Sequence, residues 1–529
     1  MDNIEKNLFR ILSIFLLIIT VIIVTFINYP RIYGEENSNP SLTITEGIAS
    51  GDVTHDSAII WSRINEPSIM HVEFANNVLF LNSKSETKLV DDTTDFTGKI
   101  KLYNLTAATT YFYRVFFSTL DNNITSSSIM GRFETAPNPS TSHNSISFIV
   151  GGDIGGQTLC RELNKGYSIF EKMIELSSDF YIQNGDMIYA DDDCPIQRLD
   201  GGQNIPGNFY GIGDPKINWN NQTQVHDVYL KHWVYNRADP HLQNFLKNTS
   251  IYSQWDDHEV INDFGANWSY WDVENQNRTG YKNLVQEGRK LFFNFSPIDR
   301  NNITDPNRIY RIFNWGDDLD LLILDARSDR SRNDMPDSIE NNKTMLGSAQ
   351  LSWLKDNLLR SNATWKVVSS DIPMSIPTGA NSSKFGHDGW ANGISLDFSS
   401  KTGFERELEE IMKFIDDNNI KNVVFVTTDV HFPIILKYNA DMNSDGDSVN
   451  VYEIISGPLS AFTFGSLSSP LLMPDPTFQP TILYVEGGIF NFAYLQIVKG
   501  TDGKNHMLVD IIGADGIARL NSHLDLIAQ

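Results

Sequence analysis

Short runs of alternating apolar and polar residues follow one another in the first part of the chain beyond residue 41. Between Leu42 and Pro137 the runs are GIASGDV, SAIIWSRI, HVEFA, KIKLY, YFYRVFF and GRFETA, with Gly, Asn and Asp residues between them. A period of two places apolar side chains on one face of a strand, and Gly, Asn and Asp favour the turns between strands. The pattern predicts a small antiparallel β-sandwich at residues 42–137.

One stretch of this region has a more specific pattern. LTAATTYFYRVFF, from Leu105 to Phe117, resembles the segment of fibronectin type III modules in which a Leu, a Thr and Tyr-x-Tyr-x-Val mark a tyrosine corner. An ordinary antiparallel strand with alternating aromatic residues is the alternative. We therefore expect a fibronectin- or immunoglobulin-like sandwich, and we find no catalytic constellation within it.

The pattern changes after the Pro/Ser/Thr-rich linker Ala136–His143. Continuous apolar runs, typical of strands buried on both faces, alternate with segments of helical periodicity. The strand-like runs are ISFIVGG, DFYIQNGD, LDLLILDAR, WKVVSS and KNVVFVTTD, and the helix-like segments include GYSIFEKMIEL, SAQLSWLKDNLL and GFERELEEIMKFIDD. This alternation predicts a layered α/β domain over residues 144–529. We expect the Asn- and Trp-rich stretch from Tyr210 to Tyr281 to form loops over the functional site.

An uncharged apolar segment precedes both regions. From Ile11 to Ile27 the chain reads ILSIFLLIITVIIVTFI, which approaches the roughly 20 apolar residues that cross a bilayer. Lys6 and Arg10 come before it, so the positive-inside rule leaves the N-terminus in the cytoplasm. We expect residues 1–41 to be a signal anchor or signal peptide with a linker, and the absence of a small-x-small cleavage site favours the anchor. The rest of the chain would then lie outside the cytoplasm, anchored to the membrane, or secreted if the segment is cleaved.

Charge and cysteine content narrow the range of functions. The 529 residues include 41 Lys and Arg against 66 Asp and Glu, a net charge of −25. So negative a surface repels the phosphate backbone of nucleic acids, which argues against nucleic-acid binding as the main role. Cys160 and Cys194 are the only cysteines, and one disulfide or two free thiols are both compatible with the sequence.

Acidic residues directly follow several of the buried strands. Asp153, Asp186, Asp325 and Asp429 each come at or just beyond the carboxyl end of an apolar run. Open α/β sheets bind their ligands at this edge. We therefore expect a functional site where these strand ends meet.

Five short motifs carry the candidate chemistry: GGDIGG, NGDMIY, WDDHE, LDAR and TTDVH. In NGDMIY, Asp186 stands where one carboxylate can bridge two cations, and Tyr189 can reach the same cation as a phenolate. WDDHE puts two carboxylates and an imidazole on one turn, and in TTDVH the side chains of Asp429 and His431 point the same way on an extended chain. Each motif alone also has an ordinary explanation as a turn, a packing contact or a solvated surface. Together, their oxygen ligands and single imidazole suit hard cations such as Fe³⁺, Ca²⁺, Mg²⁺ or Mn²⁺.

In this order, the motifs resemble the metallophosphoesterase superfamily, and most closely the PhoD-like alkaline phosphatases and phosphodiesterases. The blocks that carry the resemblance are GIASGDVTHDSAIIWSRI, DFYIQNGDMIY, QWDDHEVINDF, LLILDARSDR, LGSAQLSWLKDNLLRSNATWKVVSSDIPM and VVFVTTDVH, which together span most of the chain after residue 41. The resemblance implies an N-terminal antiparallel β-sandwich and a catalytic domain that is a four-layer α/β/β/α sandwich. It also implies two metal ions about 3.5–4 Å apart.

The resemblance assigns a role to each motif residue. Asp186 would bridge the two metals, Tyr189 and His431 would bind the first metal, and Asp257 and Asp429 would bind the second. His258 would stand near the leaving group. Arg327 would either steady the phosphate or pair with an acid, and both alternatives stay open.

Two positions depart from the family pattern. The family typically has Ser-Cys where this chain has the Gly-Asp pair that ends in Asp153, so a carboxylate replaces a thiolate on the first metal, as in the related purple acid phosphatases. The family's Gly before Asp-Val-His is Thr428 here, which would narrow the approach to the second metal. Hard oxygen ligands favour Fe³⁺ at the first position, with Ca²⁺, Mn²⁺, Mg²⁺ or Zn²⁺ at the second. A disulfide between Cys160 and Cys194 would tie the two metal-bearing loops together.

These features predict a monomeric, outward-facing hydrolase of small organic phosphate esters that serves phosphate acquisition, either a phosphomonoesterase or a phosphodiesterase. The metals would activate a water molecule, and His258 would donate a proton to the leaving alkoxide. Two other functions remain open. One is a catalytically inactive surface adhesion or envelope protein whose fibronectin-like module binds a partner. The other is a diesterase that remodels envelope polymers or lipids.

Overall fold

The computed structural model describes residues 42–143, 145–266, 277–300, 305–379, 387–391, 403–439, 441–442, 446, 448–465 and 473–529. The apolar segment Ile11–Ile27, with the expected anchor, lies outside the described residues. Within the described part of the chain, no helix is both long and apolar enough to cross a bilayer.

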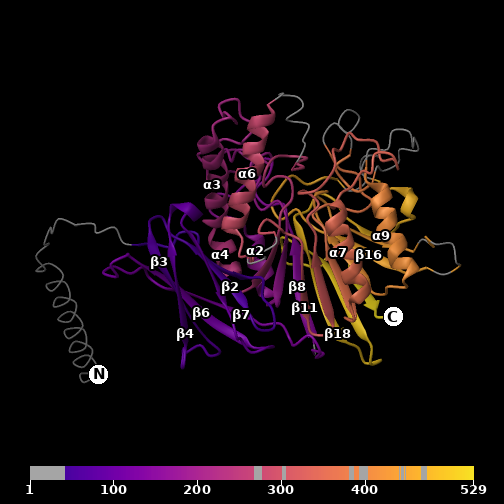
Figure 1. Cartoon of the computed structure of the whole chain (residues 1–529), viewed down its shortest axis with the longest axis horizontal. Helices are drawn as coiled ribbons and strands as arrows, with labels where there is room; N and C mark the ends of the chain where they lie inside the picture. The colour runs from indigo at the N-terminus through magenta and orange to yellow at the C-terminus, as the bar shows by residue number, and fades with distance from the viewer. Residues whose placement is uncertain are drawn as a thin grey trace, which may run out of the picture. The chain divides into compact units, whose positions relative to one another are not determined.

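The described strands form two large sheets and a small one (Figure 1). The nine-stranded sheet has the order β20-β19-β18-β8-β9-β10-β1-β2-β5. Its strands are β1 (Ile48–Gly51), β2 (Ala58–Arg63), β5 (Thr97–Leu102), β8 (Ser145–Gly151), β9 (Phe180–Asn184), β10 (Ser250–Gln254), β18 (Asn491–Lys499), β19 (Asn505–Gly513) and β20 (Leu524–Ile527). Strands β8, β9 and β10 run parallel, so their carboxyl ends meet at one edge.

The seven-stranded sheet has the order β11-β12-β13-β14-β16-β15-β17. Its strands are β11 (Arg311–Trp315), β12 (Leu319–Ile323), β13 (Trp365–Ser369), β14 (Val423–Thr427), β15 (Ile434–Tyr438), β16 (Val451–Ile455) and β17 (Thr481–Val485). The neighbouring strands β12, β13, β14 and β16 are parallel. The carboxyl ends of these four strands therefore form a second row at one edge of the sheet.

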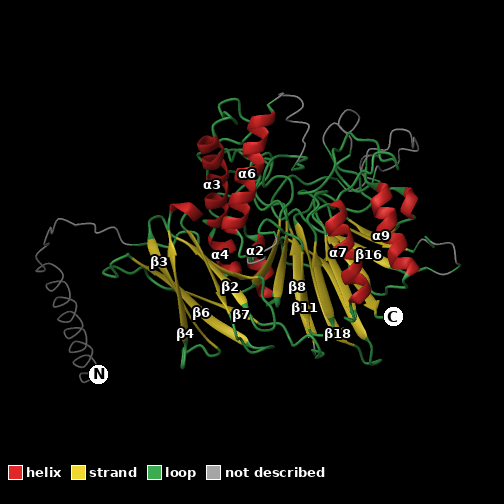
Figure 2. Cartoon of the chain, in the orientation of Figure 1, coloured by secondary structure: helices red, strands yellow, loops and turns green. Residues whose placement is uncertain are grey.

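Helices cover the outer faces of the two large sheets (Figure 2). They are α2 (Ile169–Glu175), α3 (Gln222–Arg237), α4 (Pro240–Leu246), α6 (Arg278–Phe295), α7 (Gly347–Arg360) and α9 (Glu405–Asp417), with 3-10 turns η1 (Asp92–Thr94) and η4 (Pro476–Phe478). The first four pack on the nine-stranded sheet, and α7 and α9 pack on the seven-stranded sheet. A third core lies between the two sheets. The prediction of an α/β/β/α arrangement is confirmed.

Successive residues of the apolar strands enter different cores. In β8, Phe148 packs between the two sheets, whereas Ile149 packs against the helices. In β12, Leu321 packs between the two sheets and Leu322 packs against the helices. Because neighbouring side chains of a strand point to opposite faces, a strand with a layer on each side needs apolar residues at every position. The continuous apolar runs of the sequence have this cause.

The N-terminal sandwich is also confirmed. Its four-stranded sheet has the order β4-β3-β6-β7, and all its pairs are antiparallel. The strands are β3 (Ser68–Ala75), β4 (Lys84–Val90), β6 (Thr110–Ser118) and β7 (Ile129–Glu134). This sheet shares a core with β1, β2 and β5, which themselves extend the nine-stranded sheet through the β1–β10 pair. The Tyr111 hydroxyl accepts a hydrogen bond from the Thr106 N–H at 3.0 Å, as a tyrosine corner requires.

The prediction of long loops between Tyr210 and Tyr281 is wrong for much of that stretch. It contains α3, α4 and β10 and leads into α6. The helix α3 buries Tyr229, Trp233 and several polar residues, including His232 and Asn236. Because most of the buried positions are aromatic or polar, with Val225 and Val228 as the aliphatic ones, the helical period is hard to see in the sequence.

A buried charge triad joins the N-terminal sandwich to the helices. His226, on α3, lies 2.7 Å from Asp95 Oδ1 and 2.9 Å from Glu287 Oε2 of α6, while Asp95 precedes β5. Asn294 and Lys290, also on α6, face the same Asp95 carboxylate. The hydrogen bonds to Asp95 and Glu287 raise the pKa of His226 to about 9.

This triad predicts a pH-dependent stability. The folded-state pKa of His226 lies above the unfolded value of about 6.5, so its stabilisation is complete below that pH and disappears as pH rises through about 9. We expect His226→Gln to lower the free energy of unfolding by about 1–3 kcal/mol at pH 6 and by much less above pH 9. Urea denaturation at pH 6, 8 and 10 measures this. His523→Gln, at an exposed histidine paired with Asp510, is the matched control. An equal loss of stability at all three pH values would contradict the assignment.

Candidate metal centre

The predicted site residues follow strands of both large sheets. Asp153 follows β8, Asp186 and Tyr189 follow β9, Asp257 and His258 follow β10, Arg327 follows β12, and Asp429 and His431 follow β14. The parallel strands bring these loops to one edge, where the loops of Figure 2 gather above the strand ends. Asp325, the remaining strand-end acid, instead holds its own loop, since its carboxylate accepts hydrogen bonds from the Trp255 indole and the Arg327 N–H.

The backbone turns sharply at the candidate ligands. Asp153, Asp186, Asp429 and His431 have φ angles of 60°, 51°, 75° and 58°. Residues other than glycine seldom adopt this left-handed conformation, and it concentrates at functional sites. Gly185, just before Asp186, has φ of 99°, and a Cβ there would lie 2.5 Å from the Cβ of Asp256. The Gly of the NGD motif is therefore required by both backbone angle and space.

Four candidate ligands converge in a first cluster. Oxygen and nitrogen atoms of Asp153, Asp186 and His431 all lie within 4.8 Å of one another. The Tyr189 hydroxyl is 2.9 Å from His431 Nε2 and 3.4 Å from Asp153 Oδ1. All four side chains are buried. This is the ligand set expected for the first metal.

A second cluster adjoins the first at Asp186. Ligand atoms of Asp186, Asp257 and His258 lie within 4.8 Å of one another, as do those of Asp256, Asp257 and Asp429. Asp186 is common to both clusters, as a bridging carboxylate has to be. The sequence did not indicate Asp256 as a candidate ligand.

Several carboxylate oxygens at this edge lack a hydrogen-bond partner. Asp186 Oδ2, Asp257 Oδ1 and Asp429 Oδ2 are buried and accept no hydrogen bond from any residue that the structure describes. Burial raises the pKa of Asp186 and of Asp429 well above the usual carboxyl range, and neighbouring carboxylates raise it further. Unpaired oxygens of this kind are costly unless a cation binds them. The donor set therefore fits bound metal ions.

The two departures from the family pattern contact each other. The Thr428 hydroxyl donates a hydrogen bond to Asp153 Oδ2. Thr428 was expected to narrow the approach to the second metal, but it is not among the described residues that line the cavity at the site. It orients the carboxylate that stands in place of a thiolate. Gly457 leaves room for this carboxylate, since a Cβ there would lie 2.5 Å from Asp153 Oδ2.

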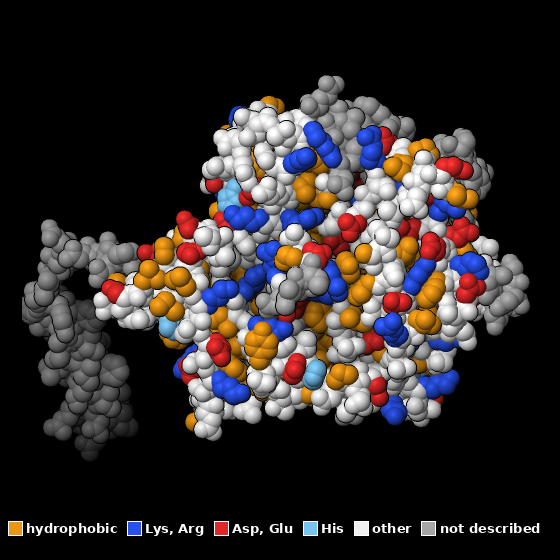
Figure 3. All heavy atoms as spheres, in the orientation of Figure 1, with side chains coloured by type: hydrophobic (Ala, Val, Ile, Leu, Met, Phe, Trp, Pro, Cys, Tyr) orange, Lys and Arg blue, Asp and Glu red, His pale blue; other side chains and the backbone are white. Residues whose placement is uncertain are grey.

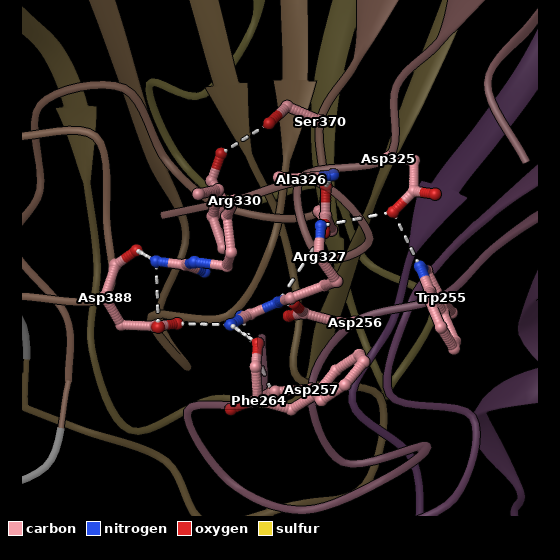
Figure 4. Close-up of polar contacts among 12 residues, drawn as sticks. Trp255, Asp256, Asp257, Phe264, Asp325, Ala326, Arg327, Arg330, Ser370 and Asp388 are labelled. Carbon is pink, nitrogen blue, oxygen red and sulfur yellow. Dashed lines mark hydrogen bonds and ion pairs between the residues drawn. The ribbon is translucent and has the colours of Figure 1, made fainter. Parts of the chain in front are cut away.

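Arg327 is buried among carboxylates, which is the second of the two roles considered for it (Figure 4). Its Nε donates to Asp256 Oδ1 at 2.7 Å, and its Nη1 lies 2.6 Å from Asp388 Oδ2. Asp257 Oδ1 is 3.7 Å from Nη2. Although burial raises the pKa of Asp257, Arg327 and His258 bring it below the usual carboxyl range. Arg327 thus keeps a candidate ligand charged and holds the loop that carries it.

His258 is oriented by contacts on two sides. Its Nδ1 lies 2.5 Å from Asp191 Oδ1, and its ring stacks on Tyr189 with centroids 4.1 Å apart. Burial lowers the pKa of His258, but Asp191 and Asp257 raise it well above its ordinary value. Nε2 is the ring nitrogen that remains for a ligand or substrate.

Glu259 is a positioning residue that the sequence analysis missed. Its buried carboxylate accepts hydrogen bonds from the N–H groups of Asp186 at 3.1 Å, Met187 at 2.7 Å and Asp256 at 2.8 Å. It therefore ties the loop after β9 to the loop after β10. The WDDHE motif contained this residue, whereas nothing in the sequence indicated Asp388 or Asp191.

A cavity of about 380 Å³ opens beside the second cluster. Asp257, His258, Asp429 and His431 form part of its wall. Phe462 and Phe464, which are 40% and 41% exposed, line it beside His431, with their ring centroids 5.2 Å apart. The cavity places candidate ligands and an aromatic wall around one space.

Cys160 and Cys194 form a disulfide. Cys160 is on the loop after Asp153, and Cys194 is on the loop after Tyr189. The bridge joins the two loops, which was one of the two possibilities that the sequence left open.

Comparison with known families agrees with this geometry. The model described as "PhoD-like phosphatase" matches residues 154–483, and that described as "PhoD-like phosphatase, N-terminal domain" matches residues 31–137. The first match includes every candidate ligand except Asp153.

Individual relatives are distant. Alkaline phosphatase D of Bacillus subtilis (strain 168) is 24% identical over 431 residues, which are 75% of this chain and 66% of that protein. A solved structure of PhoD superposes with a TM-score of 0.69 at 18% identity, covering 93% of each chain. The purple acid phosphatase PPD1 of yellow lupin (Lupinus luteus) seeds superposes with a TM-score of 0.57 at 12% identity, covering 91% of this chain and 73% of that one. These structures share the fold.

The shared position of Asp186 leads to a direct prediction. Asp186→Asn removes the one carboxylate common to both clusters, so we expect bound metal to fall from about two ions per chain towards none and hydrolysis to be lost. Elemental analysis of the purified variant measures this. Asp510→Asn, at an acid outside the clusters that pairs with the exposed His523, is the control and should keep its metal. Full metal content and normal turnover in Asp186→Asn would contradict the assignment.

Proposed function

Because the chain belongs to the PhoD-like phosphatase family, we propose that it hydrolyses organic phosphate esters at a two-metal centre built around Asp186. The observation that carries this proposal is the set of buried carboxylate oxygens without hydrogen bonds on Asp186, Asp257 and Asp429. A catalytically inactive adhesion protein would have no need to maintain such a costly arrangement.

We assign the ligands by cluster. Asp153, Asp186, Tyr189 and His431 would hold the first ion, with Fe³⁺ favoured, and Asp186, Asp257 and Asp429 would hold a divalent second ion. When bound, two such ions neutralise the phosphoryl oxygens and supply a hydroxide nucleophile near neutral pH. Glu259 and Arg327 act through the ligands, because they fix the loops that carry Asp186 and Asp257.

His258 would act on the leaving group. Asp191 holds Nδ1, which fixes the orientation of the ring and directs Nε2 away from that contact. The neighbouring carboxylates favour the protonated imidazole, which can donate a proton to the departing alkoxide. His258 lines the cavity, so it is accessible to a bound ester.

The cavity wall indicates where the organic part of an ester would lie. Phe462 and Phe464 are exposed aromatic side chains that line the cavity beside His431. We propose that they contact the organic group while the phosphate faces the metals. A volume of about 380 Å³ suits a small ester.

We further propose that the catalytic region lies outside the cytoplasm and that residues 1–41 attach it to the membrane. The Cys160–Cys194 disulfide supports this location, because disulfides persist in oxidising compartments.

Assays on esters with different leaving groups test the proposed function and the role of His258 together. The full-length protein should hydrolyse a nitrophenyl phosphate or its bis-nitrophenyl diester. His258→Asn should lower kcat by about 10²–10⁴ for alkyl esters, and by less for nitrophenyl esters, whose leaving groups need little protonation. His523→Asn is the control at an exposed site. Equal losses for both kinds of ester would indicate a ligand or structural role for His258, and no hydrolysis of any ester by the metal-loaded protein would overturn the proposed function.

The first ligand set predicts a colour. A tyrosinate bound to Fe³⁺ absorbs visible light by charge transfer, so the oxidised protein should show a visible band that Tyr189→Phe removes. Some activity should remain in the variant, because the other ligands of both ions persist. Visible spectroscopy with iron analysis measures this, and Tyr210→Phe, at an exposed tyrosine, is the control. A colourless, iron-free and fully active protein would reject Fe³⁺ and leave the two-metal proposal standing.

A further inference from the structure

A second cavity lies along α6 and is lined by none of the candidate ligands. Its volume is about 430 Å³. Its wall includes the cationic residues Lys282, Arg289, Lys290 and Arg300, with Phe293 among its apolar residues. No carboxylate is among the described residues that line it. For a chain with a net charge of −25, this concentration of positive charge is unusual.

Most of these cations are not neutralised. Lys290 has Asp95 at 3.8 Å, but Lys282, Arg289 and Arg300 have no ion pair within 4.0 Å among the described residues. Among the described residues, Arg289 donates only to the Ser328 hydroxyl, at 3.2 Å, and its buried Nε has no hydrogen-bond partner there. Unpaired buried donors are costly, so a ligand that accepts from them would stabilise this arrangement.

Neighbouring residues show the effect of the positive charge. Burial and the nearby Arg300 and Lys88 lower the pKa of Lys99 to about 7. The Lys99 ammonium donates to the Phe293 carbonyl oxygen, which places it against the same part of α6. Figure 3 shows Lys and Arg side chains gathered over and below α6, near the middle of this face.

We propose that this cavity binds a phosphate group, at a site separate from the catalytic centre. The Arg289 guanidinium is planar and can present paired donors to phosphate oxygens. Arg300 offers Nη1, because its Nε and Nη2 donate to the Pro306 carbonyl and the Asn307 side chain, and Lys282 and Lys290 add point charges. No carboxylate is among the described residues of the wall, so none of these side chains repels an anion. The phosphate can be inorganic phosphate or the phosphate of an ester.

One residue of the cavity wall, Arg289, also contacts the loop that carries Asp257. The Arg289 guanidinium lies over the Trp255 ring, 5.3 Å from its centroid. Trp255 directly precedes Asp256 and Asp257. A phosphate held by Arg289 would therefore lie behind the loop that carries a candidate ligand, and not in the catalytic cavity.

The test removes the catalytic site from the measurement. The full-length Asp186→Asn protein is titrated with inorganic phosphate and, separately, with dimethyl phosphate, by calorimetry at low salt. We expect one phosphate per chain to bind, Lys282→Gln in the same background to weaken binding by about 3–10-fold, and Lys282→Gln/Arg289→Gln to weaken it by at least about tenfold. Lys231→Gln, at an exposed lysine of α3, is the control and should not change the affinity.

The two probes distinguish free phosphate from a phosphate ester as the ligand, and the variants decide whether the cavity binds either one. Binding of inorganic phosphate alone identifies the free ion as the ligand, and binding of dimethyl phosphate identifies an ester. If neither probe binds, or if the Lys282 and Lys282/Arg289 variants bind as tightly as the control, the proposal is overturned. Should the double variant fail to fold, Lys282→Gln alone decides, because this side chain is exposed. If Asp186→Asn is unstable, chelator-treated protein with intact Asp186 replaces it.

Discussion

The burial of many carboxylates at one edge of two sheets is the constraint on which the rest of the structure depends. Anionic side chains inside a protein are stable only where positive charge or hydrogen-bond donors meet them. The chain meets this requirement in three ways. Glu259 accepts three backbone N–H groups, and Asp256 and Asp388 share the buried Arg327. Asp186 Oδ2 and Asp429 Oδ2 have no hydrogen-bond partner among the described residues, so they would need a bound cation.

The fold supplies the geometry for this arrangement. Parallel strands in each sheet bring their carboxyl ends to one edge, and the core between the sheets fixes that edge from both sides. Candidate ligands therefore come from both halves of the layered domain, Asp153 and Asp186 from one sheet and Asp429 from the other. The left-handed backbone at these residues is maintained because the strands before them are buried and rigid.

Thr428 and Asp153, the two residues that depart from the family pattern, are in direct contact. We therefore interpret them as one local adaptation. A carboxylate has two oxygens to orient where a thiolate has one sulfur atom, and the Thr428 hydroxyl takes one of them. The other oxygen then faces Tyr189 and His431. At the proposed first metal, this pair of residues would provide a harder ligand set, to which we would attribute a difference in metal preference.

Much of the fold was predictable because it follows from local patterns. Continuous apolar runs identified β8, β9, β12, β13 and β14, and motifs at their ends named the candidate ligands that the structure brings together. The sequence pattern did not predict the helix α3, because most of its buried positions are aromatic or polar. The partners of Arg327 and His258 were also missed. Asp388 and Asp191 are far from those residues in sequence, and only tertiary contacts bring them together.

Anomalous diffraction from crystals of the metal-loaded, full-length protein tests the central claim most directly. The account predicts two anomalous peaks with the Asp186 carboxylate between them, one against Asp153 and His431 and the other against Asp257 and Asp429. A single peak, peaks outside these carboxylates, or no peak in protein that still hydrolyses phosphate esters would contradict it.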